Sequence, residues 1–249
     1  MNDMSTKRIL AILEEDGRVL HPATGTPQGG IVSPVLANIY LHYVLDLWTE
    51  RTVRRGGRGQ LEYMRYADDF VCGFEHEDEA RRYLGELRER LAKFGLKLAE
   101  AKSGIVRFHR HDLQSGVFTF LGFDFYWANT RRTFRTVKRR TNKKKFRVSL
   151  AALQEWLREN RSQRLRWLGE RLCAKFQGHW NYYGVISNSP SLQAYWFSAK
   201  RLVFKWLNRR SQRRSYSWAT FGEMWQTLGI PEPRIVEIPY RPQPHLPLS

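Results

Sequence analysis

Two adjacent carboxylates, Asp68 and Asp69, stand inside the stretch YMRYADDFVCGF, residues 63–74. The residues on either side are mostly aromatic, β-branched or otherwise apolar, and such types favour a pleated, partly buried surface. The stretch therefore predicts a strand, a tight turn at Ala67 and the two aspartates, and a second strand. Two carboxylates held close together repel one another, and a buried hairpin tip would also strip their hydration, so a cation is needed to keep both ionised.

The cation that fits such a pair is Mg²⁺. Hard oxygen ligands, few in number and beside apolar residues, suit an ion that keeps water ligands and binds substrate phosphates. The alternative is an ordinary solvated Asp-Asp turn, which is the commoner role of this dipeptide in a hairpin. The rest of the chain has to decide between a metal site and a plain turn.

Hydrophobic spacing predicts the elements that position this hairpin. Ser33 and Pro34 are typical of a helix start, and apolar residues then recur at helical spacing as far as Leu47. We expect that helix to pack against the hairpin. A second helix is predicted from Asp78 to a stop at Gly95. Helices on one face of a mainly antiparallel sheet define the α+β class.

Weaker signals surround these elements. Residues 4–15 predict a short helix, and residues 54–60, RRGGRGQ, predict a flexible basic loop. Residues 96–98 and 104–108 are strand-like, and VFTFLGFDFYW, residues 117–127, predicts a strand pair that turns near its glycine.

The positive charge of the chain is concentrated in its C-terminal half. The formal net charge is +18, and residues 131–214 hold 23 Lys or Arg against three Glu and no Asp, while the rest of the chain is nearly neutral. Such a block indicates a polyanionic partner. The chain has no apolar run of about 18 residues that could span a membrane, and its N-terminus lacks the apolar core of a secretory signal. We therefore expect no membrane association and a cytoplasmic location, in a prokaryotic cell or alternatively in an organelle.

Three amphipathic segments inside the basic half predict an all-α bundle, namely residues 150–157, 165–183 and 192–207. Tryptophans alternate with Arg and Lys along them. The composition changes abruptly near residue 131, which predicts a domain boundary, and six prolines crowd residues 231–247. The predicted division is an α+β part at 1–130, a basic linker or hairpin arm at 131–147, a helical part at 148–230 and an extended proline-rich tail at 231–249.

Four strings of the sequence, in this order and spacing, resemble the second half of the palm of group II intron reverse transcriptase/maturase proteins. They are TPQGGIVSPVLANIYLHYVLD at 26–46, YMRYADDFVCG at 63–73, LKLAEAKSGIV at 96–106 and FTFLGFDF at 118–125. The string WNYYG at 180–184 resembles the thumb or maturase region of the same family. The resemblance covers roughly residues 15 to 215. It implies a partial reverse transcriptase palm followed by a helical thumb/maturase bundle, and an RNA-directed DNA polymerase that also binds its intron RNA and assists splicing.

The resemblance also implies roles for individual residues. Asp68 and Asp69 would be catalytic and would ligate Mg²⁺ or Mn²⁺, Asp68 more directly, in a two-metal phosphoryl-transfer site. Lys102 would lie near the incoming triphosphate and protonate the leaving pyrophosphate, although a solvated surface lysine is the alternative. The substrate-binding positions that the resemblance implies are Gln28, Gly29, Gly30, Tyr66, Ala67, Phe120, Leu121 and Gly122.

Two of these groups have a stated physical role and a plain alternative. In residues 28–30 glycine removes the Cβ that would keep the backbone from the templating base pair, and the alternative is an ordinary glycine turn. Residues 120–122 would grip the primer end, and the alternative is a core strand.

The basic half would bind folded RNA, because cations neutralise phosphates and aromatic rings stack on unpaired bases. The RNA-binding candidates are Arg139, Arg140, Lys143, Lys144, Lys145, Arg164, Arg166, Lys175, Lys200, Arg201 and Lys205. The competing interpretation is that the tryptophans form the bundle core and the arginines a solvated face, and for most of the tryptophans we expect the core. The implied partners are group II intron RNA, an RNA template with a DNA primer, and deoxynucleoside triphosphates.

The sequence departs from the family pattern before its first motif. Palms of this kind take another aspartate from a strand ahead of the PQG string, and residues 1–26 contain no such strand and no fingers residues for the triphosphate. We therefore expect a C-terminal part of a longer protein that polymerises poorly or not at all alone, with an N-terminal fragment as the partner that supplies the missing aspartate. The alternative is a non-catalytic RNA-binding maturase fragment that assists splicing. A non-enzymatic DNA-binding protein is the least supported interpretation, because it leaves the aspartate pair unexplained.

Overall fold

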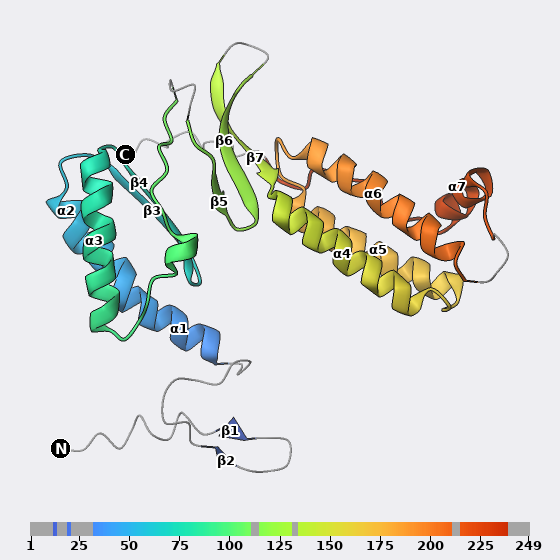
Figure 1. Cartoon of the computed structure of the whole chain (residues 1–249), viewed down its shortest axis with the longest axis horizontal. Coiled ribbons are helices and arrows are strands. Elements are labelled where there is room, and N and C mark those ends of the chain that lie inside the picture. Colours follow the sequence, from blue (N-terminus) through green and yellow to red (C-terminus); the bar gives the residue numbers. More distant parts are fainter. Residues whose placement is uncertain are drawn as a thin grey trace, which may run out of the picture. The chain divides into compact units, whose positions relative to one another are not determined.

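The computed structural model describes residues 12–13, 19–20, 32–110, 115–130, 134–210 and 215–238. The chain divides into two compact units, residues 1–105 and residues 106–249. Within the described residues the elements are small antiparallel sheets and helices, and most of the helical structure follows the last strand (Figure 1). The predicted α+β class, with a helical region after the sheets, is confirmed.

Among the described residues, two short strands come first. β1 (Ile12–Leu13) and β2 (Val19–Leu20) pair antiparallel. The helix predicted over 4–15 is therefore wrong at residues 12–13. Each of the two strands contains one β-branched residue, a type that favours strands. The rest of that predicted helix lies outside the described residues, as do Gln28, Gly29 and Gly30.

A long helical segment follows and contains two π-helical stretches. α1 (Ser33–Leu41), η2 (His42–Asp46), η3 (Thr49–Val53) and α2 (Arg54–Gly56) run on without a break in helical structure. Helix formation is confirmed, but its predicted apolar face is only partly buried. Val44 and Leu45 are 1% and 2% exposed, whereas Val35 is 56% exposed. The helix thus packs into the core of its unit through its second half.

The predicted hairpin is confirmed. β3 (Leu61–Tyr66) and β4 (Asp69–Phe74) pair antiparallel with Tyr66 opposite Asp69, so that Ala67 and Asp68 form a two-residue turn. Alternate residues of a strand point to opposite faces. One face packs Tyr63 and its neighbours against the helical core, and the other face is open.

α3 (Glu77–Lys93) closes the first unit. Its Tyr83, Leu87 and Leu91 are buried together with residues of the long helix and of the hairpin. The helix ends before Gly95, which has a φ of 68°, a left-handed conformation that glycine adopts without strain. In Figure 1 the long helix and α3 lie beside the β3–β4 hairpin. The predicted order of helix, strand, strand, helix is therefore correct.

Two predictions for the connecting segments of this unit are wrong. The loop predicted over 54–60 begins with helix α2 at Arg54–Gly56, and the Glu79 carboxylate accepts hydrogen bonds from the backbone nitrogens of Arg58 at 2.7 Å and Gly59 at 3.3 Å. A basic, glycine-rich composition therefore did not make it a free loop. Residues 96–98 and 104–108 are irregular, and among the described residues no strand pairs with them. A 3₁₀ turn, η4 (Glu100–Lys102), lies between them in the chain.

The second unit begins with a three-stranded antiparallel sheet. β5 (Phe118–Phe120), β6 (Phe123–Asn129) and β7 (Arg135–Thr141) pair in sequence order, and Leu121 and Gly122 form the turn between the first two. The predicted strand pair is confirmed. The basic segment predicted as a linker or hairpin arm contributes β7 and the start of α4. The compact units divide before the predicted boundary near residue 131, because the sheet groups with the helices; the functional domains stay a prediction.

The described part of this unit continues with the helices α4 (Lys143–Asn160), α5 (Leu165–Tyr183), α6 (Ser189–Leu207) and α7 (Trp218–Thr227). Their core includes Phe176 and the tryptophans at 180, 196, 206 and 225. The expectation that most bundle tryptophans are core residues is therefore confirmed. The sheet lies at one end of the helices and α7 at the other (Figure 1). α7 was not predicted, although Ser217 and Thr220 cap its start through reciprocal hydrogen bonds, a pattern that sequence can signal.

Residues 231–238 are extended and are hydrogen-bonded to the rest of the second unit. The Trp180 indole nitrogen donates to the Pro231 carbonyl at 2.9 Å, and the Val236 nitrogen donates to the Gly184 carbonyl at 2.7 Å. Glu237 accepts a hydrogen bond from Arg139 at 2.6 Å. The remainder of the predicted tail lies outside the described residues. None of the described helices combines the length and the apolar character that a membrane crossing requires.

Candidate functional site

The carboxylate pair lies at the turn of the β3–β4 hairpin. Asp68 is the second residue of the turn, Asp69 begins β4, and both are exposed. The register puts Asp69 on the same face as Tyr66 and Met64, which are 67% and 65% exposed. This face is opposite the one that packs on the helices. The pair is therefore open to a ligand from solution.

This exposure corrects part of the sequence-based argument for a cation. The tip is not buried, so its carboxylates keep their hydration, and only their mutual repulsion favours a bound cation. Within the part of the chain that the structure describes, no group of three or more His, Cys, Asp and Glu side chains could enclose a metal. Two open carboxylates nevertheless fit Mg²⁺, which usually takes one or two protein carboxylates and completes its shell with water and phosphate oxygens.

The turn itself has an unfavourable backbone conformation. Ala67 has a φ of 53°, in the left-handed region that residues with a Cβ rarely adopt. Such a conformation costs about 1–3 kcal/mol and persists only where the surroundings hold it. The Ala67 carbonyl oxygen accepts a hydrogen bond of 2.7 Å from Nη1 of Arg65. A side chain from the adjoining strand therefore holds the peptide that joins Ala67 to Asp68.

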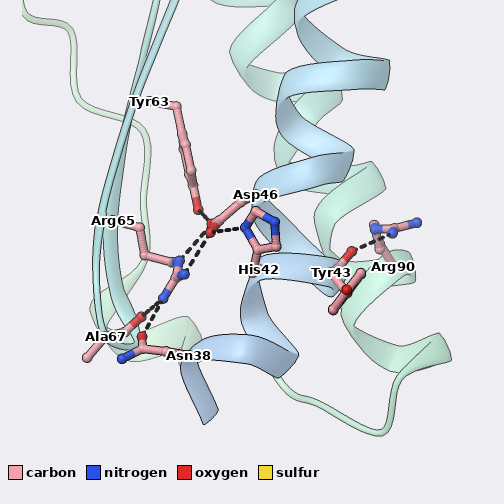
Figure 2. A network of polar contacts seen from close by, with 8 residues as sticks. All are labelled: Asn38, His42, Tyr43, Asp46, Tyr63, Arg65, Ala67 and Arg90. Carbon is pink, nitrogen blue, oxygen red and sulfur yellow. Dashed lines mark hydrogen bonds and ion pairs between the residues drawn. The ribbon is translucent and has the colours of Figure 1, made fainter. Parts of the chain in front are cut away.

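Arg65 is itself fixed by the long helix (Figure 2). Its Nε and Nη2 donate to the two carboxylate oxygens of Asp46, each at 2.7 Å, and its Nη1 also donates to Oδ1 of Asn38 at 2.9 Å. The hydroxyl of Tyr63 donates to Asp46 at 2.7 Å. The side chains of Arg65 and Asp46 are 12% and 20% exposed. The guanidinium thus joins α1 and η2 to the turn that carries the aspartates.

The Arg65–Asp46 pair is charged in the folded protein. Burial acts to raise the pKa of Asp46, but the hydrogen bonds from Arg65 and Tyr63 outweigh it, so the pKa lies below its usual value. The hydrogen bond to Asp46 raises the pKa of Arg65 further. Burial and the neighbouring Asp46 carboxylate raise the pKa of the Tyr63 hydroxyl, which therefore remains a donor. The contact keeps its charges throughout the physiological pH range.

The remaining predicted residues of the first unit are Tyr66 and Lys102. Tyr66 lies on the open face of the hairpin beside Asp69. Lys102 is exposed at the end of η4. That short turn is held to α3 by Arg88, whose Nε and Nη2 donate to the Glu100 carboxylate at 2.8 and 2.9 Å.

The predicted primer-binding turn belongs to the second unit. Leu121 and Gly122 have φ values of 49° and 78°, the pattern of a two-residue turn that matches the twist of a hairpin. Only the glycine adopts this conformation without strain. The hydroxyl of Tyr182 donates to the Leu121 carbonyl at 2.9 Å, and its ring stacks on Phe123. This turn and the Ala67–Asp68 turn thus each contain a strained residue whose carbonyl accepts a hydrogen bond from a side chain.

The RNA-binding candidates differ in how much they are engaged within the protein. Arg139 binds Glu237, and Nε of Arg140 lies 3.6 Å from Asp124. Arg166 pairs with Glu170, and Lys175, Lys200 and Lys205 lie over tryptophan rings at 156, 225 and 206. The other candidates are exposed and make no such contact among the described residues. They are Lys143, Lys144, Lys145, Arg164 and Arg201.

Sequence reasoning missed Arg65, Asp46 and Asn38. A signal was present, because Arg65 interrupts the apolar residues on the inward face of a strand, and Asp46 stands among the apolar residues of a helix. Charged residues at inward positions are rarely buried unless they are paired. Their mutual distance could not be read from the sequence.

The fold and the site describe an α+β domain in which an antiparallel hairpin, backed by helices, presents two adjacent carboxylates at an open turn. Residues 2–125 match the family model for reverse transcriptase (RNA-dependent DNA polymerase). This part of the chain is similar to the reverse transcriptase domain of RNA-dependent DNA polymerases. The match includes both aspartates, Lys102 and the two turns, and it ends within β6. No curated protein matches the chain.

Proposed function

We propose that the chain takes part in RNA-directed DNA synthesis as a group II intron reverse transcriptase/maturase, with Asp68 and Asp69 as its metal ligands. The observation that carries the proposal is the exposed carboxylate turn, hydrogen-bonded by Arg65, inside the region that matches the reverse transcriptase model. Template RNA, a DNA primer and deoxynucleoside triphosphates are the substrates. Intron RNA is the further partner.

Each residue of the proposed site has a defined task. Asp68 and Asp69 hold Mg²⁺ or Mn²⁺, which, when bound, neutralises charge on the triphosphate and orients it. Tyr66 lines the same open face, and Ala67 keeps the turn free of a bulky side chain. Lys102 donates a proton to the pyrophosphate as it leaves. By the family resemblance, residues 120–122 would bind the primer end, and residues 28–30 would contact the templating pair.

Primer extension on an RNA template with Mg²⁺ tests this assignment. Asp68→Asn should lower the rate by about a hundredfold or more, because reacting groups lose their placement. Asp69→Asn should have a smaller effect if Asp68 is the more direct ligand. Glu89→Gln, at an exposed position of α3, removes the same charge and should leave the rate unchanged.

Extension by this chain alone is expected to be weak, so cation binding provides a second measurement. Mn²⁺ affinity, followed by electron paramagnetic resonance, should fall in Asp68→Asn and stay unchanged in Glu89→Gln. Equal Mn²⁺ affinity in the wild type and in Asp68→Asn would refute the metal site. Robust extension by the wild-type chain would instead show that the expectation of weak polymerisation was wrong.

RNA binding by the helical unit is a second function that the charge distribution favours. Lys143, Lys144 and Lys145 occupy the first turn of α4, where the positive end of the helix dipole disfavours cations. All three are exposed. A phosphate backbone near this turn would offset the unfavourable charge, and we propose that intron RNA supplies it.

Filter binding across a salt series tests the RNA site. A steep loss of affinity with salt is expected, and Lys144→Glu should reduce the slope by about one for each phosphate that the variant no longer neutralises. Lys93→Glu, at the end of α3 in the other unit, makes the same charge change and should leave the slope unaltered. A wild-type affinity that does not respond to salt would rule out phosphate contacts as its source.

A further inference from the structure

We propose that Arg65 is a positioning residue that fixes the Ala67–Asp68 peptide and thereby sets the placement of the Asp68 and Asp69 carboxylates. The inference rests on the proposed function, because it concerns the same divalent-cation site. Arg65 touches neither substrate nor metal in this assignment. It acts through the backbone of the turn.

The geometry of the guanidinium makes it suited to this task. The group is planar, and its nitrogens donate in fixed relative directions. Nε and Nη2 are taken by the two oxygens of Asp46, which orients the plane. The direction of Nη1 is then determined, and it donates to both Asn38 and the Ala67 carbonyl. The position of the helix is transmitted to the turn through one rigid group.

The turn needs such support because it does not hold its own shape. Ala67, with its φ of 53°, would relax to a more common conformation if its carbonyl were released. That relaxation would rotate the peptide immediately before Asp68 and move both carboxylates. Functional groups must stay within about 0.5 Å of their productive positions. Loss of one hydrogen bond at Ala67 is therefore a local change with a large effect on cation binding.

The other predicted substrate turn provides an independent parallel. Leu121 is also a non-glycine residue with positive φ, and its carbonyl accepts a hydrogen bond from Tyr182. Strained backbone conformations concentrate at functional sites, where surrounding structure holds them. In both turns a side chain holds the strained carbonyl.

Arg65→Lys tests the positioning role, because lysine keeps the charge but cannot form the planar set of hydrogen bonds. We expect its Mn²⁺ affinity, measured by electron paramagnetic resonance, to fall about 10- to 100-fold, as is typical when a group behind a metal ligand is removed. Arg54→Lys is the matched control. Arg54 also binds a carboxylate with two nitrogens, Nε and Nη2 to Glu50 at 2.8 and 3.1 Å, on the surface of the same unit. Its affinity should equal that of the wild type.

Asp68→Asn separates the failure of this inference from the failure of the proposed function. If Asp68→Asn loses Mn²⁺ and Arg65→Lys binds it as the wild type does, the positioning role is wrong and the metal site stands. If Asp68→Asn and the wild type bind equally, the metal site is wrong. The positioning role is then judged by amide hydrogen exchange alone, which needs no metal.

Hydrogen exchange distinguishes positioning from general stabilisation. Arg65→Lys should speed exchange about tenfold or more at Asp69, which pairs with Tyr66 beside the turn, as expected for a local opening, while Leu87 in the core of α3 stays protected. Unchanged exchange at the turn would overturn the inference, as would equal acceleration at the turn and at Leu87. If Arg65→Lys does not fold, Asn38→Ala replaces it, since this change removes one hydrogen bond and leaves the Asp46 pair. A smaller decrease in affinity is expected, and an unchanged affinity would also count against the inference.

Discussion

Single residues in this protein show how strain and burial are offset locally. Ala67 and Leu121 occupy left-handed conformations at the two turns proposed to contact substrate, and in each case one hydrogen bond holds the carbonyl. A bond of this kind contributes about 0.5–1.5 kcal/mol, which is comparable to the cost of the strained conformation. The partners, Arg65 and Tyr182, therefore decide whether each turn keeps its shape.

His179 is a residue whose burial should make stability depend on pH. Its ring stacks on Tyr195 with centroids 3.7 Å apart, and burial lowers its pKa from 6.5 to about 4. Between these two values the unfolded chain takes up a proton that the folded chain does not. The free energy of unfolding should therefore be unaffected by His179 above pH 6.5. It should decrease as the pH drops towards 4, by at most about 3 kcal/mol.

Urea denaturation at a series of pH values measures this effect. His179→Phe keeps the aromatic stack and removes the titrating group, so it should flatten the pH dependence between 4 and 6.5. His76→Phe, at an exposed position of the other unit, should leave the dependence as it is. An identical pH dependence in the wild type and in His179→Phe would contradict the assignment to this residue.

Among the elements, the long helix over residues 33–56 has the least regular structure. Arg90 of α3 donates to the carbonyl oxygens of Val44 at 2.6 Å and Tyr43 at 3.4 Å, and its guanidinium lies over the rings of Trp48 and Phe94. Arg90 therefore links α3 to the carbonyl oxygens of the first π-helical stretch.

Replacing Arg90 should destabilise this packing between helices. Arg90→Met keeps the length of the side chain and removes its donors, so the Val44 carbonyl loses a part-buried hydrogen bond, at a cost of about 1–3 kcal/mol. Thermal or urea unfolding measures the loss, and hydrogen exchange should quicken within His42–Asp46. Lys93→Met, three residues later on the exposed side of α3, is the control. Equal effects of the two changes would show that the hydrogen bonds to the carbonyls contribute nothing specific.

Local patterns predicted the elements that carry their own signals. The hairpin followed from aromatic and β-branched residues around Ala67, and the end of α3 followed from Gly95. Elements whose state depends on whether another strand pairs with them were missed or misjudged. Residues 96–98 and 104–108 have strand-like composition but no described strand to pair with, and Ile12–Leu13 found one across a short interval. Pairing is a property of the whole chain, so composition alone could not decide these cases.

In the candidate site, too, local motifs could be predicted from the sequence and contacts between distant residues could not. Asp68, Asp69 and Lys102 could be proposed from motifs, whereas the role of Arg65 depends on Asp46 and Asn38, which are distant in sequence and close in space. Exposure of the hairpin tip was also misjudged. The strand alternation predicts which residues share a face, but it does not say which face the helices cover.

For the whole molecule, the two compact units have separate hydrophobic cores. One core centres on Val44, Leu45, Tyr83 and Leu87, and the other on the side chains of α4 to α7. The sequence indicated this division through charge, because the basic block falls within the second unit and leaves the remainder nearly neutral. Charge did not locate the boundary, since the sheet of the second unit begins before the basic block.

Separate cores predict that a cavity in one unit leaves the other intact. Leu172→Ala in α5 removes a side chain that is 1% exposed, and Leu87→Ala in α3 removes one that is 2% exposed. Each change should destabilise its own unit by about 2–5 kcal/mol. Hydrogen exchange followed by mass spectrometry should show reduced protection in α5 and α6 for the first variant and in α3 for the second. Each variant serves as the control for the other, and reduced protection throughout the chain in both would mean that the units unfold as one.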